Sequence, residues 1–258
     1  MCAQGTELRI KLSDRMQVIA DHIEPGETVA DIGTDHGQIP VWLFAQGVCP
    51  RAILTDISEG SLAKAKETAA AYQFGSGLDF RAGDGLQVLA PGEADAVIIA
   101  GMGGKLIRQI LADSPEHTFS FRKYILQPRK GAGPLRKWLL ENGFRIAGED
   151  IVREGRHLPE IITAISPGDP SSKSWTERDL ADHDRTELVR LPEEDVRLRV
   201  PPWMIHAHGP LKDYFAYRIS QEELILTNLQ RARTPEPELE KKIHENIAYL
   251  EGLSHEIQ

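Results

Sequence analysis

The stretch Thr28–Pro40, T-V-A-D-I-G-T-D-H-G-Q-I-P, decides the fold. Its apolar run Val29–Ile32 leads into two glycines, Gly33 and Gly37, and a helix-like apolar run follows over Ile39–Phe44. The order of strand, glycine turn and helix is typical of the first βα crossing in a nucleotide-binding type of α/β sheet. A glycine at that turn lets the backbone come close to a ligand at the carboxyl end of the strand.

A second stretch repeats this pattern. In Ala94–Gly104, A-D-A-V-I-I-A-G-M-G-G, another buried strand runs directly into glycines. Two strand-to-glycine turns in one open sheet predict a single ligand cleft with two walls.

The rest of the chain first alternates between strands and helices and then changes to a hairpin. Further strands are expected at Arg51–Asp56, Leu78–Asp84, Asp95–Ala100 and Tyr124–Pro128, with helices at Leu12–Ile23, Ser61–Tyr72, Lys105–Leu111 and Pro134–Asn142. Two strands at hairpin spacing follow, Phe144–Val152 and Leu158–Ile165. This order predicts an α/β fold with a doubly wound, Rossmann-like mixed sheet of about seven strands.

The C-terminal third has a different character. Ser166–Arg199 is polar and lacks apolar periodicity, so we expect a boundary or an insertion there. Two amphipathic helices follow, at Lys212–Arg231 and from Leu239 to Ile257, and they predict an antiparallel, coiled-coil-like α-helical hairpin. The expected division is therefore a sheet domain at 1–166, a linker or insertion at 167–210 and the hairpin at 211–258.

Composition narrows the class of protein. The formal net charge of −9 argues mildly against a polyanionic partner, yet the run Arg122–Lys137 holds six basic residues and no acid, and phosphate contacts need only such a local patch. Cys2 and Cys49 are the only cysteines, too few for a disulfide framework or a zinc site. Without a membrane-length apolar run or a signal-peptide core, we expect a cytoplasmic protein with no metal.

The charge of the glycine turn indicates which ligand the cleft takes. A pyrophosphate loop needs G-x-G-x-x-G, but Asp35 occupies the second glycine position and His36 follows it. A carboxylate there would repel a diphosphate, which argues against a nicotinamide cofactor. S-adenosylmethionine carries a sulfonium and an amino group and no phosphate, so Asp31 and Asp35 suit its charge.

Two further acids stand at expected strand ends. Asp56 follows Gly37 by 19 residues, where such folds place the carboxylate that binds ribose hydroxyls. Asp84, in G-D-G, is placed to meet the adenine amino group. Aspartates at strand ends also cap helices and turns, and that reading stays open for each of them.

Six motifs in order carry a resemblance to a known family. They are L-S-D-R-M (Leu12–Met16), A-D-I-G-T-D-H (Ala30–His36), G-D-G-L (Gly83–Leu86), I-A-G-M-G-G (Ile99–Gly104), L-Q-P (Leu126–Pro128) and L-R-K-W-L (Leu135–Leu139). Together they resemble the bacterial tRNA (adenine-22-N1)-methyltransferase family, over about Leu12 to Ile162. The resemblance implies a class I methyltransferase domain with a C-terminal coiled-coil domain, and methyl transfer from S-adenosylmethionine to N1 of a tRNA adenine.

The resemblance, together with the chemistry of methyl transfer and the positions of the basic side chains, indicates roles for individual residues. Asp35 and Met102 are the catalytic candidates. Donor-binding candidates are Asp31, Gly33, Asp35, His36, Asp56, Ile57, Asp84, Gly85, Ala100, Gly101 and Met102. Candidates for tRNA contact are Arg9, Lys11, Arg15, Gly103, Gly104, Arg129, Lys130, Arg136 and Lys137. This chain departs from the family pattern at Asp56 (usually Glu), Gly37-Gln38 (usually Ala-Tyr), Arg129 (usually Asn) and His157–Pro159 (usually with Tyr).

Several alternatives remain open at this point. Asp35 either stabilises the cationic product ring or only holds the donor's amino group, or caps the next helix. The hairpin either grips tRNA or makes a homodimer, so the working form is a monomer or a homodimer. The competing functions are methyl transfer to a small molecule or a protein, and a non-catalytic binding protein; a dehydrogenase fits least.

Overall fold

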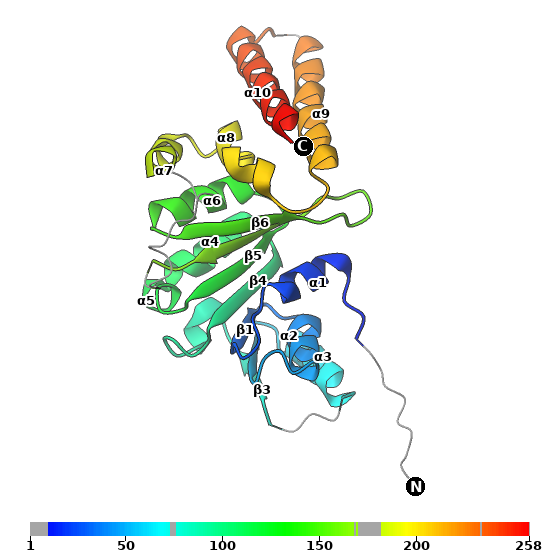
Figure 1. The fold of residues 1–258 in the computed structure, drawn as a ribbon, viewed down its shortest axis with the longest axis vertical. Helices are drawn as coiled ribbons and strands as arrows, with labels where there is room; N and C mark the ends of the chain where they lie inside the picture. Colours follow the sequence, from blue (N-terminus) through cyan, green and yellow to red (C-terminus); the bar gives the residue numbers. More distant parts are fainter. Residues whose placement is uncertain (1–9, 73–75, 168, 170–181, 233, 258) are drawn as a thin grey trace.

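The computed structural model describes residues 10–72, 76–167, 169, 182–232 and 234–257. Arg9, expected to contact tRNA, lies outside these residues. The described part is elongated, with a helical hairpin projecting from one end of an α/β domain (Figure 1).

A seven-stranded mixed sheet forms the centre of the molecule, as the sequence predicts. Its order is β3-β2-β1-β4-β5-β7-β6. The strands are β1 Val29–Ile32, β2 Ala52–Asp56, β3 Leu78–Ala82, β4 Ala96–Met102, β5 Lys123–Pro128, β6 Arg145–Ile151 and β7 Glu160–Ile165. The first five strands pair in parallel, whereas β7 is antiparallel to both β5 and β6. The carboxyl ends of β1 to β4 therefore lie along one edge.

Helices cover both faces of the sheet (Figure 1). One face carries α1 Asp14–Asp21, α2 Gln38–Ala45 and α3 Glu59–Ala70, and the other carries α4 Gly104–Asp113, α5 Pro115–Thr118 and α6 Ala132–Glu141. Neighbouring strand residues alternate between the two cores: Ile98 packs with the first group and Ile99 with the second. Because both faces are covered, the strands read as continuous apolar runs in the sequence.

Helix α1 is shorter than the expected Leu12–Ile23. It begins at Asp14 because the Ser13 hydroxyl accepts a hydrogen bond from the Met16 amide at 3.4 Å and caps the helix.

The polar segment expected as a linker or insertion is a packed layer over part of its length. It contains α7 Asp182–Arg190, α8 Val196–Arg199 and the 3₁₀ helix η3 Pro202–His206; a second 3₁₀ helix, η1, spans Gly85–Val88. Leu188 and Leu198 are buried in the core under α4 and α6. Val196, Val200 and Met204 are buried as well, but these apolar residues belong to short elements and two different cores, so they produce no periodic pattern in the sequence.

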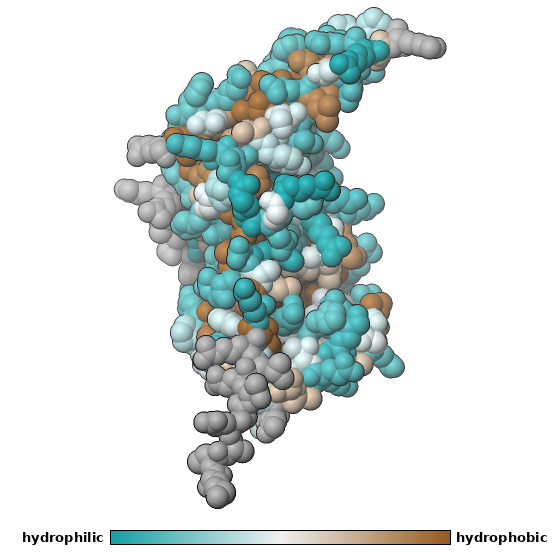
Figure 2. Space-filling model, turned by 90° about the vertical axis from the view of Figure 1, so that its right-hand side faces the viewer, coloured by the Kyte–Doolittle hydropathy of each residue, from teal (hydrophilic) through white to brown (hydrophobic). Residues whose placement is uncertain are grey.

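The C-terminal hairpin consists of α9 Leu211–Gln230 and α10 Pro237–Glu256, which lie side by side as expected. Its base packs through a small core that includes Tyr214, Phe215, Leu250 and Leu253. Further along, the seam is polar, because Asn246 donates a hydrogen bond to the buried Glu222 carboxylate at 2.8 Å. Hydrophobic side chains interrupt the hydrophilic surface at this end of the molecule (Figure 2). No helix within the described residues is long and apolar enough to cross a membrane.

Candidate active site

The carboxyl ends of four parallel strands bring the expected donor-site residues together. Gly33 follows β1, Asp56 ends β2, Asp84 stands two residues beyond β3, and Gly101 and Met102 end β4. Residues far apart in the sequence thus share one edge of the sheet, where ligands bind in open α/β sheets.

The first glycine turn fits closely under a methionine. Gly33 has a φ of +73°, in the left-handed region that favours glycine. A Cβ built on Gly33 would lie 2.1 Å from the Met102 Cε, so the methionine methyl rests on the glycine backbone. The two walls that the sequence predicts, after β1 and after β4, are therefore in direct contact.

Asp31 is a buried carboxyl beneath this turn. It is 7% exposed, and the Thr34 hydroxyl donates a hydrogen bond to its Oδ2 at 2.6 Å. Burial raises the pKa of Asp31 to about 6; the Thr34 hydrogen bond opposes this shift, and the Asp56 charge adds to it. A cation bound near Asp31 would favour its ionised carboxylate.

Asp35 and Asp56 are linked through the backbone. The Asp35 amide donates to Asp56 Oδ2 at 3.2 Å, and the Ser58 amide donates to Asp56 Oδ1 at 2.8 Å. Asp35 has a φ of +46°, an uncommon value for a residue other than glycine. Its side chain is 59% exposed, with Lys64 Nζ 3.4 Å away and His36 Nε2 3.8 Å away. This strained residue therefore presents its carboxylate at the mouth of the site.

Asp84 and Ile57 are both exposed near the ends of their strands. Asp84 precedes η1, and its side chain makes no capping hydrogen bond. Ile57 directly follows the β2 carboxylate and is 75% exposed, the highest value among the large hydrophobic residues that the structure describes. An exposed isoleucine directly after a strand-end acid fits a flat apolar ligand with polar edges, such as a nucleoside.

A β-bulge at Gly101 sets the second wall. The β4–β5 register shifts between Ala100 and Met102, and the Gly101 amide donates to Gln127 Oε1 at 3.1 Å. The same oxygen accepts a hydrogen bond from Arg15 Nη1 at 3.0 Å. Gln127, which is 2% exposed, was part of a motif in the sequence but was not predicted to position the site.

The predicted tRNA-contact residues fall into different environments. Lys11, Arg129 and Lys130 are exposed. Arg15 is 19% exposed and forms an ion pair with Glu154 at 3.1 Å. Gly104 is buried, its amide donates to the Lys130 carbonyl at 2.8 Å, and a Cβ there would lie 2.2 Å from the Gly131 oxygen. Gly104 thus has a structural reason to be glycine, whereas nothing lies within 4 Å of a Cβ on Gly103.

The expectation that Arg136 contacts phosphate is wrong. Its side chain is fully buried between Glu149 and Glu160, so it cannot reach a ligand. Lys137 is also mostly engaged, because its ammonium donates to the Leu191 carbonyl and lies 3.8 Å from Glu141. The two basic residues of α6, Arg136 and Lys137, are therefore used for contacts within the protein and do not form an exposed basic patch.

The acids around Arg136 join the hairpin to the sheet domain. Arg218 on α9 forms an ion pair with Glu160 on β7, and Tyr214 donates to the same carboxylate at 2.9 Å. Burial acts to raise the pKa of Glu160, but the charges of Arg218 and Arg136 outweigh it and hold the pKa below its ordinary value. No local sequence pattern indicates this network, because its members come from elements far apart in the chain.

The sheet order, the glycine turns and the strand-end carboxylates define the class: a Rossmann-like methyltransferase domain. The comparison with protein families agrees, since residues 12–162 match the methyltransferase domain family. The match covers more than half of the chain, and the chain belongs to this family. Within the described residues, no three His, Cys, Asp or Glu side chains are grouped to hold a metal ion.

Individual relatives are more specific. The chain is 36% identical over 155 residues to the tRNA (adenine(22)-N(1))-methyltransferase of Bacillus subtilis, a match that covers 60% of this chain and 65% of that protein. It thus spans slightly under two thirds of that relative. The crystal structure of the B. subtilis m1A22 tRNA methyltransferase superposes with a TM-score of 0.74 and 27% identity, over 97% of this chain and 100% of that one.

A third comparison concerns the fold alone. A Streptococcus pneumoniae structure described in complex with S-adenosyl-L-methionine is 22% identical, with a TM-score of 0.75, over 95% of this chain and 100% of that one. The likeness extends through the helical hairpin as well as the sheet domain.

Proposed function

We propose that this protein transfers a methyl group from S-adenosylmethionine to N1 of adenine 22 in tRNA. The observation that carries the proposal is the similarity to the B. subtilis m1A22 enzyme, which reaches 36% identity over 155 residues and extends in structure over 97% of this chain. The strand-end residues support the same donor, because they fit its charges and its apolar ring.

Each donor-site residue has a distinct part in this proposal. S-adenosylmethionine, when bound, supplies a methyl group on a positively charged sulfur. Asp31 would hold the amino group, Asp56 the ribose hydroxyls and Asp84 the adenine amino group, with Ile57 against the adenine ring. The exposed Asp84 carboxylate, which makes no capping hydrogen bond, and the exposed Ile57 are the local features that support this assignment.

The reaction places modest demands on the protein. Adenine N1 has a lone pair, so in-line transfer needs no prior deprotonation and the main task is to position the two reactants. N1 lies on the pairing edge of the base, so the adenine has to leave its stack to react. Asp35, exposed at the mouth of the site, would stabilise the positive charge that develops on the ring. Met102, which ends β4 over the Gly33 turn, would contact the base.

The test is a methyl-transfer assay with purified protein. Unmodified tRNA transcripts are incubated with S-adenosylmethionine, digested and analysed for 1-methyladenosine by mass spectrometry. The proposal predicts 1-methyladenosine in the tRNA digest. Saturable donor binding by calorimetry without any tRNA product would instead favour a small-molecule or protein acceptor. The proposal also includes a cytoplasmic location and a monomer or homodimer as the working form, which analytical ultracentrifugation distinguishes.

A further inference from the structure

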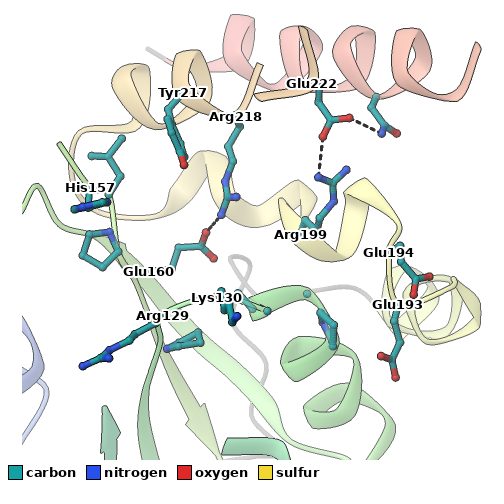
Figure 3. A pocket seen from close by; sticks show the side chains of 18 of the residues that line it. Arg129, Lys130, His157, Glu160, Glu193, Glu194, Arg199, Tyr217, Arg218 and Glu222 are labelled. Atoms are coloured by element: carbon teal, nitrogen blue, oxygen red, sulfur yellow. Dashed lines mark hydrogen bonds and ion pairs between the residues drawn. The ribbon is translucent and has the colours of Figure 1, made fainter. Parts of the chain in front are cut away.

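A large cavity lies between the sheet domain and the hairpin. Its volume is about 1000 Å³, at the upper end of the ~300–1,000 Å³ common for ligand pockets. The end of β5, the start of α6, the β6–β7 turn, α8 and both hairpin helices line it (Figure 3). Asp35, Asp56, Asp84 and Met102 do not line it. The cavity therefore has its own lining, and it adjoins the donor site through Gln127 and Arg129, whose neighbours are Gly101 and Met102.

The charges of this cavity leave unpaired cations on one wall. Most lining acids are matched by cations of the protein: Glu154 by Arg15, Glu160 by Arg136 and Arg218, Glu193 by Arg108 and Glu222 by Arg199. Arg129 and Lys130 are exposed, and within the described part of the chain their side chains have no hydrogen-bond or ion-pair partner. The first turn of α6, capped by Gly131 without a side-chain hydrogen bond, continues this wall. The wall suits an anion such as a phosphate.

The opposite wall, formed by the hairpin, is mixed: it carries aromatic and aliphatic side chains beside polar and charged ones such as Arg218, Glu222 and Asn246. Tyr217, Ile225 and Leu239 belong to the hairpin, line the cavity and are 44%, 40% and 36% exposed. Tyr217 reaches from α9 into the space facing the wall of Arg129 and Lys130 (Figure 3). An aromatic ring opposite unpaired cations is the combination that binds a nucleotide of single-stranded RNA, with the base stacked and the phosphate paired.

Arg129 connects this cavity to the donor site. Its amide donates to the Met102 carbonyl at 2.7 Å, and its Nη2 lies 3.9 Å from a Cβ built on Gly101. The proposed function places the reacting adenine near Met102. A guanidinium there would repel the positive charge that develops on the adenine ring, so the favourable partner of Arg129 is a phosphate and not the target base. A strand whose phosphate lies on Arg129 would extend from the donor site into the cavity.

We propose that this cavity binds an unstacked tRNA nucleotide adjacent to the target adenine, with its phosphate on Arg129 and Lys130 and its base against Tyr217. The inference rests on the proposed function and extends it, because it assigns a second nucleotide site to the space under the hairpin. It also gives a physical role to Arg129, a position where this chain departs from the family pattern.

The experiment measures steady-state methyl transfer to an unmodified tRNA transcript, with donor affinity measured by calorimetry. Tyr217→Ala is compared with Tyr217→Phe, which keeps the ring, and with Leu224→Ala, which removes an α9 side chain that is 55% exposed and does not line the cavity. Arg129→Ala and Lys130→Ala are compared with Lys241→Ala, which removes a lysine of α10, 72% exposed and outside the cavity.

Tyr217→Ala is expected to raise the KM for tRNA roughly tenfold, the size of one base–aromatic stack, while Tyr217→Phe retains most of the wild-type affinity. Arg129→Ala and Lys130→Ala are expected to raise the same KM and to lower the salt dependence of tRNA binding by about 0.7 in log–log slope per lost contact. Donor affinity is expected to stay at the wild-type level in all variants. The two control variants are also expected to keep the wild-type KM for tRNA. If wild-type protein methylates tRNA and the cavity variants leave KM and salt slope unchanged, the inference is wrong. If wild-type protein makes no methylated tRNA, the proposed function fails and this inference fails with it.

Discussion

The Arg218 guanidinium of α9 binds the Glu160 carboxylate of β7, and this partly buried ion pair joins the helical hairpin to the sheet domain. The same carboxylate is paired with Arg136 of α6 at 2.5 Å. One acid thus holds two cations from two different parts of the fold, and it sets the position of the hairpin above the cavity.

Glu160→Gln is expected to destabilise the protein by roughly 3 kcal/mol, because it leaves the buried Arg136 and the partly buried Arg218 short of one negative charge. Urea denaturation measures the loss. The control is Arg153→Ala, which breaks an ion pair with Asp213 whose side chains are 52% and 61% exposed. That variant should lose less than about 1 kcal/mol. Similar small losses in both variants would contradict a structural role for Glu160.

Asp31 is expected to make stability fall as pH rises. Its pKa is raised from 3.8 unfolded to about 6 folded, so folding favours the protonated form. The stabilising contribution is complete below the unfolded pKa and is lost as pH rises through the folded pKa. Asp31→Asn should therefore be the more stable protein at neutral pH, by at most about 3 kcal/mol, and the gap should close toward about pH 4.

The ionisation of Asp31 can also be measured through the pH dependence of donor binding. An ionised Asp31 is needed to hold a cationic amino group, so wild-type affinity for S-adenosylmethionine should increase as pH rises through about 6. Asp31→Asn should bind the donor weakly at every pH, measured by calorimetry. A variant that binds the donor as well as wild type would remove Asp31 from the donor site.

Asp35→Asn separates catalysis from donor binding. Asparagine accepts the φ of +46° at this position at least as well as aspartate, so the backbone should be retained. We expect kcat to fall more than donor affinity, since the lost charge acts on the cationic ring that forms during transfer. Equal losses in kcat and in donor affinity would show that Asp35 only holds the donor.

Gly104 and Gly103 form a matched pair of substitutions. Gly104→Ala places a Cβ 2.2 Å from the Gly131 oxygen and 2.8 Å from its carbonyl carbon, a backbone clash that no rotamer relieves. We expect a loss of about 1–3 kcal/mol. Gly103→Ala meets nothing within 4 Å and should keep stability within about 0.5 kcal/mol. An increase in the tRNA KM for Gly103→Ala would support its predicted contact with the substrate.

The sequence predicts the sheet and the common edge of its strand ends well because both depend on local signals. Apolar runs that end in a glycine or an acid mark β1, β2 and β4, and the carboxyl ends of parallel strands always meet at one edge. The placement of Asp31, Asp35, Asp56 and Asp84 at this edge follows from these signals, whereas their contacts with a donor stay a prediction. The hairpin was predicted from helical periodicity in the same manner.

The sequence does not predict features that depend on distant partners. Arg136 reads as part of a basic surface run, yet its charge is neutralised inside the protein by Glu149 and Glu160, which lie on later strands. Tyr217 reads as one exposed residue on an amphipathic helix, and only the packing of α9 over β7 places it above a cavity. Such roles follow from tertiary contacts that no local pattern encodes.

The most direct test of the account uses two tRNA transcripts that differ only at position 22, one with adenine and one with guanine. Each is incubated with wild-type protein and S-adenosylmethionine, and the digested nucleosides are analysed by mass spectrometry. Methyl transfer to N1 of adenine 22 predicts 1-methyladenosine from the adenine transcript and none from the guanine transcript. Equal amounts from both transcripts, or none from either while the donor binds, would contradict it.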